Sequence, residues 1–329
     1  MSEYIKEHIQ KIAQSLRLEN DVLLIPYGKD GKYLPPYSPE DDEKKALQQL
    51  ANALYFAYYC KNTHLGHTDS YGHMQADLLE ELRAANTGKP GVSHNWFVTQ
   101  SLGENNGVFA ERRNQSNFFY SHEIAGTSGN QKPSYAFNEC INVYNQTEYF
   151  DDKSIFYHVF SETPYLKYPV GAVRFYFNIV PEGMPRLVHA LSSVFNSHAV
   201  PFHFKCIRQR HDFGRCDTAV LYVASQHAQV VSYIIESLRP GLDPFVRDLS
   251  PMFTHRLSRG ISFAENPDTN ESFGMTRMHI LAQALYEQVT AKAGFSGLYD
   301  CFLDHLNSGG YSPSHIYRNP RSGFHYSFL

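Results

Sequence analysis

Cationic and apolar side chains alternate in residues 200–223, which read Val-Pro-Phe-His-Phe-Lys-Cys-Ile-Arg and, after a basic loop, Arg-Cys-Asp-Thr-Ala-Val-Leu-Tyr-Val. We expect two strands joined by a glycine-containing loop. Because successive strand side chains point to opposite faces, His203 and Lys205 share one face while Phe202 and Phe204 enter a core. A histidine and a lysine beside several arginines could bind a phosphate group and move protons next to it.

A second strand, predicted at residues 170–180, has the same alternation. Arg174, Tyr176 and Asn178 share its polar face. If the strands are neighbours, these groups converge with the first set on one patch, where an arginine fork would grip phosphate. The alternative is an ordinary solvent-facing sheet surface. We favour the phosphate site, because a tyrosine and two bulky cations are unusual on such a surface.

Two further places could hold an anion. Arg215 and Asp217 are two residues apart at the start of the strand expected at 215–223, so the aspartate could orient the arginine against phosphate. The equal alternative is a surface ion pair worth about 0–1 kcal/mol. Later in the chain, Ser272 begins a predicted helix in whose first turns Arg277 lies, and a helix N-terminus favours anions.

Other kinds of site are disfavoured. His64, His67 and His73 lie in a turn-rich stretch without carboxylate or cysteine companions, so a solvated loop is expected rather than a metal site. The five cysteines are scattered without a C-x-x-C pair, which indicates reduced thiols in a cytosolic protein. Residues 212–214 read Asp-Phe-Gly, but the other kinase motifs are absent.

Composition limits the partners. The net charge of −4 and the pI near 6.5 do not suggest bulk nucleic-acid binding. No apolar run approaches the ~18 residues of a membrane span, and the N-terminus lacks the apolar core of a signal peptide. We therefore expect a cytoplasmic protein with neither nucleic acid nor membrane as a partner.

Hydrophobic periodicity predicts an α+β fold with a mixed or antiparallel sheet flanked by helices. A helical N-terminal region is expected at residues 1–95 and the α+β domain at 96–329. Residues 114–150 are polar and stay unassigned. The helices are predicted at 1–19, 38–58, 74–86, 184–196, 226–239 and 275–292. Beyond the strands named above, strands are predicted at 97–102, 107–113, 157–160 and as a pair within 251–264.

Ordered blocks of the chain resemble those of the HopA type III effector family over about residues 157–288, the most specific part of the α+β domain. The blocks are Arg174-Phe-Tyr-Phe-Asn178, Pro201-Phe-His-Phe-Lys205, Arg215-Cys-Asp-Thr-Ala-Val-Leu-Tyr222, Phe253-Thr254, Gly260, Ala264-Glu-Asn-Pro267, and Ser272-Phe-Gly274 with Arg277.

The resemblance implies an activity. Members include plant-pathogen effectors and stand-alone proteins of bacterial peptide-modification clusters of the lanthipeptide type. There a kinase similar to aminoglycoside phosphotransferases phosphorylates Ser or Thr of a precursor peptide. The HopA-like protein then acts as a phosphoserine or phosphothreonine lyase, eliminating phosphate to leave a dehydroamino acid. The partners implied are the phosphorylated peptide and that kinase.

Such a β-elimination needs a base, an acid and cations, but no metal or organic cofactor. Lys205 is the expected base; a free lysine has a pKa near ~10.4, so its pKa must fall by roughly three units, or ~4 kcal/mol. His203 is the expected acid, with His211 or His255 as alternatives. The residues expected to bind phosphate or substrate are Arg174, Tyr176, Arg215, Asp217, Tyr222 and Arg277.

Two other functions stay open. The basic face could be a docking patch of a non-catalytic, effector-like interaction protein. It could also belong to a phosphopeptide-binding module that never turns its ligand over. Release of phosphate from a phosphopeptide distinguishes a lyase from both.

Overall fold

The computed structural model describes residues 2–19, 22–27, 32–33, 42–60, 77–103, 107–112, 115–125, 134–163, 171–269 and 271–328. The histidines at 64, 67 and 73 lie outside these ranges, as do the starts of the helices predicted at 38 and 74. Every strand pair in the described part is antiparallel, which confirms the α+β class and resolves the choice between a mixed and an antiparallel sheet.

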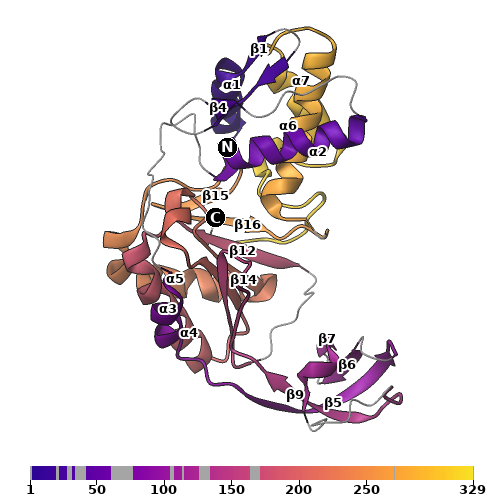
Figure 1. Ribbon diagram of the computed structural model, residues 1–329, viewed down its shortest axis with the longest axis vertical. Coiled ribbons are helices and arrows are strands. Elements are labelled where there is room, and N and C mark those ends of the chain that lie inside the picture. The colour runs from indigo at the N-terminus through magenta and orange to yellow at the C-terminus, as the bar shows by residue number, and fades with distance from the viewer. Residues whose placement is uncertain are drawn as a thin grey trace.

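A seven-stranded sheet occupies the middle of the described structure, in the order β10-β11-β13-β14-β12-β16-β15 (Figure 1). The predicted strands of this region are confirmed within a few residues. Six of the seven strands were predicted: β11 (Phe156–Phe160), β12 (Ala172–Phe177), β13 (His203–Ile207), β14 (Ala219–Ala224), β15 (His255–Ser258) and β16 (Ile261–Glu265). The seventh, β10 (Glu148–Phe150), lies in the residues left unassigned.

One face of this sheet is an apolar layer. Phe204 lies opposite Leu221, Leu221 opposite Phe175, and Phe175 opposite Phe263, so one cross-strand row is apolar across four strands. All four side chains are fully buried. The helices α3 (Leu79–Ala85), α4 (Met184–Ser197) and α5 (Ala228–Leu242) lie on one side of the sheet (Figure 1). The alternation therefore leaves the opposite face to the polar members of each strand.

The N-terminal helices pack against helices near the C-terminus. Helix α2 (Glu43–Leu54), which continues as the π-helical turn η1 (Tyr55–Cys60), packs on α6 (Phe273–Thr290). Helix α1 (Ser2–Ser15) packs on α7 (Leu298–Ser308), which the sequence analysis did not predict. One hydrophobic core runs from Ile5 to Tyr326. The division at residues 95/96 stays a prediction, but it falls inside a strand and the first helices share the large core.

Gly274 sets how closely α6 approaches η1. A Cβ atom there would lie 2.5 Å from Cε1 of Tyr59 and 2.6 Å from Cε2 of Tyr55, and these two rings stack with centroids 5.0 Å apart. We expect Gly274→Ala to destabilise the protein by about 1–3 kcal/mol, because overpacking outweighs the better helix propensity of alanine.

The matched control is Gly241→Ala in α5, where a Cβ atom meets nothing within 4 Å. That change should be neutral or stabilising by up to about 1 kcal/mol. Urea unfolding of both variants measures the contrast, and equal midpoints would contradict it.

A five-stranded sheet, in the order β7-β6-β5-β9-β8, stands apart from the central sheet (Figure 1). It has its own small core around Trp96. Three strands of this sheet, β7, β8 and β9, lie within the unassigned residues 114–150, as does β10 of the central sheet. The bounds are β5 (Gly91–Ser101), β6 (Val108–Arg112), β7 (Gln115–Phe119), β8 (Ile124–Ala125) and β9 (Cys140–Asn145).

Two short hairpins complete the N-terminal part: β1 (Arg17–Glu19) with β2 (Val22–Leu24), and β3 (Pro26–Tyr27) with β4 (Lys32–Tyr33). No helix in the described part of the chain combines the length and the apolar character that a membrane crossing needs.

Candidate functional site

Polar side chains of three adjacent strands gather on the face of the central sheet opposite the apolar row. His203 of β13 lies opposite Tyr222 of β14, and Tyr222 lies opposite Arg174 of β12. Directly opposite residues of antiparallel strands share a face. The sequence therefore predicted the common face correctly, although β14 separates the two strands that were expected to be neighbours.

The adjacent cross-strand row brings in the lysine. Lys205 lies opposite Val220, which lies opposite Tyr176, and on the other side Lys205 lies opposite His158 of β11. The row continues to Tyr149 of β10. Neither row contains a carboxylate, so the centre of this face is cationic and aromatic.

Arg174 and Lys205 are held by neutral groups. Arg174 is only 8% exposed; its Nε donates to Oδ1 of Asn266 at 2.7 Å, and its guanidinium carbon lies 5.0 Å from the ring centroid of Tyr222. The Nζ atom of Lys205 lies 4.6 Å from the ring centroid of Phe156. Within the described residues, neither cation forms an ion pair. Cations held out of water without acidic partners favour an anionic ligand.

Tyr222 lies between the two cations and stacks on His203, with ring centroids 5.0 Å apart and an interplanar angle of 15°. The Nζ atom of Lys205 is 5.8 Å from the Tyr222 ring centroid. Burial alone would raise the pKa of Tyr222, but Arg174 and Lys205 outweigh it and lower this pKa from its ordinary value of 10.0. The Tyr222 hydroxyl is therefore a stronger proton donor than an ordinary phenol.

His158 is a member of this face that the sequence analysis missed. Its Nδ1 atom and Nε2 of His203 are 2.9 Å apart, within hydrogen-bonding distance. Phe160 stacks on His203 from the same strand as His158, with centroids 4.7 Å apart. The available signal was the alternation Tyr-His-Val-Phe in residues 157–160, which places His158 and Phe160 on one face.

Both imidazoles are neutral near pH 7 in the free protein. Burial and the ammonium of Lys205 lower the pKa of His158 to about 4. Burial, His158, Lys205 and Arg174 lower the pKa of His203 well below 6.5. A neutral imidazole accepts or donates a hydrogen bond but carries no proton to give away as a cation.

These pKa values make the free energy of unfolding depend on pH. Between pH 6.5 and 4 the unfolded chain binds a proton at His158 that the folded chain does not, so the protein loses stability as the pH falls through this window. We expect His158→Phe to reduce the loss between pH 7.5 and 4.5 by about 2 kcal/mol. Urea unfolding at both pH values tests this, and parallel curves for variant and parent would contradict it.

Comparisons with known proteins identify the family. A family model described as the HopA1 effector protein family matches residues 152–318. The chain belongs to this family. The matched region contains the whole cationic face, from His158 to Tyr222, together with β16, α6 and α7. A comparison with curated protein sequences finds no match.

Two solved structures of Pseudomonas syringae effector proteins are similar to this HopA1-family chain. The effector from pathovar tomato strain DC3000 is 20% identical with a TM-score of 0.41, and the match covers 50% of this chain and 63% of that one. The effector from pathovar syringae strain 61 is 15% identical with a TM-score of 0.46, covering 84% and 96%. This chain therefore spans less than two thirds of the first of these effectors.

Arg215 and Asp217 of the HopA1-family region form a bidentate pair just before β14 begins. Nε and Nη2 of Arg215 donate to the two carboxylate oxygens of Asp217, each at 2.8 Å, and Nη2 also lies 3.4 Å from the Tyr55 hydroxyl. Their side chains are 13% and 7% exposed, so this is not the surface pair of the alternative prediction. The backbone N–H of Cys216 donates to the carbonyl of Cys60 at 2.7 Å, so the pair lies where η1 joins the sheet.

Arg277 is fully buried and anchors the C-terminal segment. Its Nε and Nη2 donate to the carbonyls of Ile316 and Arg318 at 2.9 and 2.7 Å, and its guanidinium packs between the rings of Phe273 and Tyr311. The predicted serine cap is present, because Ser272 Oγ accepts from Met275 N. The helix start is thus as predicted, but the arginine donors are used by backbone carbonyls.

The remaining candidates lie at or beyond the margin of the cationic face. Tyr176 is on this face but only 2% exposed, with its ring 6.5 Å from that of Phe273. His255 lies opposite Phe263, on the apolar side of the sheet. His211 is exposed in the loop between β13 and β14, with Nε2 3.4 Å from Asp212. Neither alternative acid belongs to the cluster.

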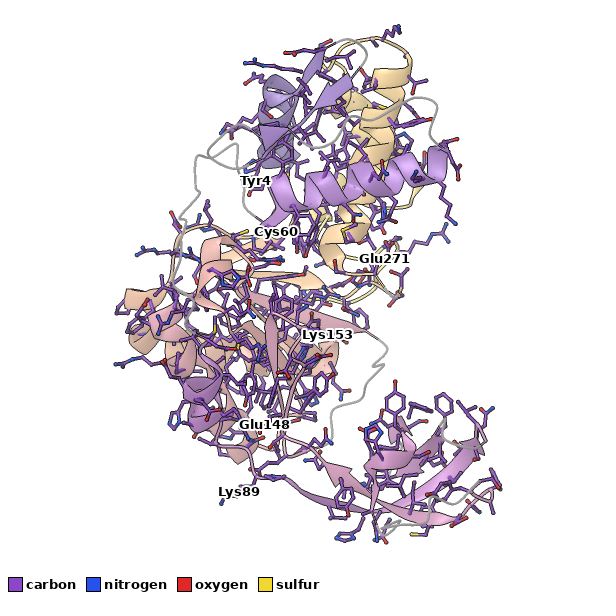
Figure 2. All side chains as sticks on the ribbon, in the orientation of Figure 1. Tyr4, Cys60, Lys89, Glu148, Lys153 and Glu271 are labelled. Atoms are coloured by element: carbon purple, nitrogen blue, oxygen red, sulfur yellow. The ribbon has the colours of Figure 1, made fainter. Side chains whose placement is uncertain are left out.

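A cavity of about 370 Å³ lies beside the cationic face, between the edge of the central sheet and the five-stranded sheet. Phe160 joins the cavity to the cationic face, since it lines the cavity and stacks on His203. Figure 2 shows the side chains of the five-stranded sheet standing apart from those around Glu148 and Lys153. The aromatic lining residues are Phe119, Tyr120, Tyr144, Tyr149 and Phe160.

Proposed function

We propose that this HopA1-family protein is a phosphoserine or phosphothreonine lyase that converts a phosphorylated peptide into a dehydroamino acid. One observation carries the proposal: Arg174, which is buried, and Lys205, which is half-buried, face the same side of the sheet among aromatic rings and without an acidic partner in the described residues. A phosphomonoester supplies the missing negative charge. An amine beside it supplies a base.

The reaction is a β-elimination. In its uncharged amine form, Lys205 Nζ takes the Cα proton of the phosphorylated residue and becomes an ammonium, and the electron pair of that C–H bond forms the Cα=Cβ double bond. The Cβ–O bond breaks, and its electron pair leaves with phosphate. Arg174 stabilises the negative charge on the leaving oxygens, because its guanidinium fork matches two phosphate oxygens. No redox partner is required.

The leaving phosphate needs a proton, and Tyr222 and His203 are the donors on this face. Tyr222 carries a proton at neutral pH, and its lowered pKa suits donation. His203 is neutral in the free protein. A bound phosphate dianion offsets the positive charges that lower its pKa, so His203 gains acid character only with substrate present. We assign Tyr222 as the leading donor. His203 stacks on its ring and positions it, and His158 in turn holds His203 through the contact between their ring nitrogens.

The neighbouring cavity supports a peptide as the substrate. A free phosphoamino acid needs only the cationic face, whereas the adjacent aromatic cavity can take a side chain of a longer ligand. We expect Tyr144→Ala, which removes a lining ring that belongs to β9 and is 47% exposed to solvent, to raise the KM for a phosphopeptide about tenfold. The KM for free phosphothreonine should not change.

Tyr233→Ala in α5 is the control, because Tyr233 is 65% exposed and lies outside the cavity. Steady-state phosphate release with both substrates gives the values. An equal change of KM for both substrates, or none for the peptide, would argue against the peptide subsite.

The proposal is tested by incubating the pure protein with peptides carrying phosphoserine or phosphothreonine and following them by mass spectrometry. Elimination gives a product one water lighter than the unphosphorylated peptide, and this product adds a thiol. In a gene cluster the phosphopeptide would come from a kinase similar to aminoglycoside phosphotransferases.

The family is described as one of effector proteins. One alternative is therefore an effector-like protein that docks on a partner without catalysis. In that case the phosphopeptide mass stays unchanged. Saturable binding without a mass change would instead indicate a phosphopeptide-binding module.

A further inference from the structure

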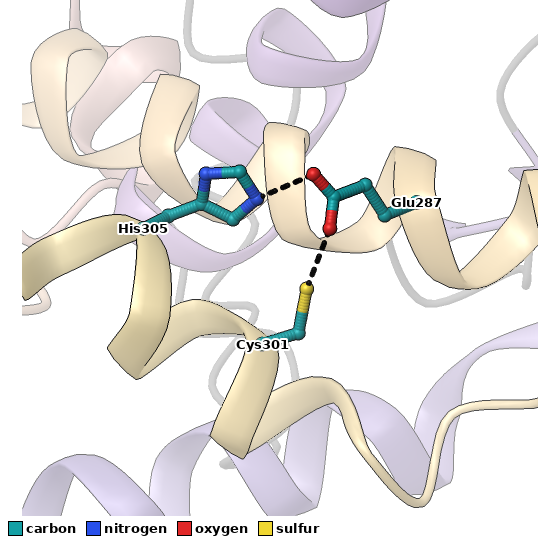
Figure 3. Close-up of side chains that lie close together, drawn as sticks. All are labelled: Glu287, Cys301 and His305. Carbon is teal, nitrogen blue, oxygen red and sulfur yellow. Dashed lines mark hydrogen bonds and ion pairs between the residues drawn. The ribbon is translucent and has the colours of Figure 1, made fainter. Parts of the chain in front are cut away.

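A cysteine, a histidine and a glutamate converge between α6 and α7 (Figure 3). Glu287 of α6 accepts from both of the others: His305 Nε2 lies 2.9 Å from Oε1, and Cys301 Sγ lies 3.3 Å from Oε2. One ligand atom from each residue lies within 4.8 Å of the other two. It is the one such group among the described residues.

The helices fix this arrangement. Cys301 and His305 are four residues apart on α7, so they lie one turn apart on the same helix face. That face packs against α6, which presents Glu287. A bound ion would therefore join two helices rather than a flexible loop.

The three donor atoms suit a transition metal. Zn²⁺ accepts thiolate, imidazole and carboxylate ligands together in tetrahedral geometry, at about 2.0–2.3 Å from the metal. Donor atoms in such a site are about 3.3–3.6 Å apart, so the side chains need to move by only about 1 Å. Glu287 is 57% exposed, which leaves the site open to a water molecule as a fourth ligand.

A reactive-cysteine role fits less well. Burial and the hydrogen bond to Glu287 raise the pKa of Cys301 to about 11. The thiolate, which is the nucleophile, is then scarce at neutral pH. His305 directs its Nε2 atom to Glu287, so neither neighbour activates the thiol.

We propose that Cys301, His305 and Glu287 form a Zn²⁺ site that joins α6 to α7. The ion takes no part in the proposed elimination, because the site is remote from the cationic face. Glu287 lies 14 residues after Phe273, the α6 residue next to Tyr176, which corresponds to about 21 Å along the helix. The ion would hold the C-terminal helix pair on which α1 and α2 pack.

The test uses untagged, reduced, chelator-treated protein titrated with Co²⁺ as a spectroscopic substitute for Zn²⁺. We expect about one Co²⁺ per chain with a thiolate-to-cobalt charge-transfer absorption that Zn²⁺ removes by displacement. Cys301→Ser should abolish the absorption, and His305→Ala should weaken Zn²⁺ binding at least about tenfold. Circular dichroism checks that each variant is folded.

Cys140→Ser is the matched control, because Cys140 is an exposed cysteine of β9 in the five-stranded sheet. It should keep the full absorption. The proposal is overturned if the parent protein gives no charge-transfer absorption, or if Cys301→Ser keeps it. If Cys301→Ser does not fold, Cys301→Ala, which adds no polar group, takes its place with the same expected loss. These measurements do not depend on elimination activity, so the metal site and the proposed function are tested independently.

Discussion

We expect Lys205→Met to lower the rate of the proposed phosphate elimination by about 10³-fold, the usual contribution of a general base. Methionine keeps the aliphatic stem that packs beside Phe156 and removes only the amine. The KM should change less than kcat, because Arg174 still binds the phosphate. Rates of phosphate release from a phosphothreonine peptide measure the effect, with Lys205→Ala expected to give the same loss.

Lys11→Met is the matched control. Lys11 lies on α1 and pairs with Glu7 at 2.7 Å, outside the cationic face. Its loss should leave the rate unchanged. A Lys205→Met protein that retains full activity and an unaltered unfolding curve would show that the base is a different group.

If the proposed function holds, we expect Arg174→Lys to raise the KM for a phosphopeptide about 10- to 100-fold. The change keeps one positive charge but removes the fork that binds two phosphate oxygens and the hydrogen bond to Asn266. A charge-assisted hydrogen bond contributes about 1.5–3 kcal/mol, which corresponds to this range of affinity. Binding of phosphate or of a non-reactive phosphopeptide should weaken in parallel.

Arg277→Met provides the contrast. Its hydrogen bonds to the carbonyls of Ile316 and Arg318 predict a loss of about 3 kcal/mol in unfolding free energy. The KM of the folded fraction should stay the same. If instead Arg277→Met raises KM and Arg174→Lys does not, the phosphate lies beside α6 and our assignment of the site is wrong.

The shared face of Lys205 and Arg174 could be predicted from the sequence because strand alternation is a local property. Apolar side chains at every second position fix which groups lie opposite the core. Which strands are neighbours depends on contacts between distant segments, and the intervening position of β14 leaves no trace in periodicity. The alternation therefore predicted the shared face correctly, but it did not predict the order of the strands in the sheet.

His158 was missed because the sequence of a short strand does not show which residue lies opposite its histidine, so no functional role could be inferred. It becomes part of the site only through its position opposite Lys205. Arg277 illustrates the converse. Its spacing from a helix cap suggested an anion site, but sequence cannot show that backbone carbonyls from residues 316 and 318 already occupy its donors.

The five-stranded sheet was predicted only in part. The strands expected at 97–102 and 107–113 are confirmed as β5 and β6, whereas β7, β8 and β9 lie in residues 114–150, which stayed unassigned. Strands β7 and β8 are short, and β9 carries the exposed Tyr144 next to the buried Val143. A strand with apolar groups on both faces gives no clear polar and apolar alternation. The cavity beside Phe160, on which our peptide assignment depends, was therefore not foreseeable from sequence.

Cleavage of the Cα–H bond is the event that separates elimination from hydrolysis and from binding, and isotopic labelling measures it directly. The substrate is a phosphothreonine peptide with deuterium at Cα of the phosphorylated residue, analysed by mass spectrometry after incubation with the pure protein. We predict a product that has lost both phosphate and the deuterium, and none with Lys205→Met. A product that regains its hydroxyl and keeps the deuterium, or a phosphopeptide that stays intact, would contradict lyase chemistry at this face.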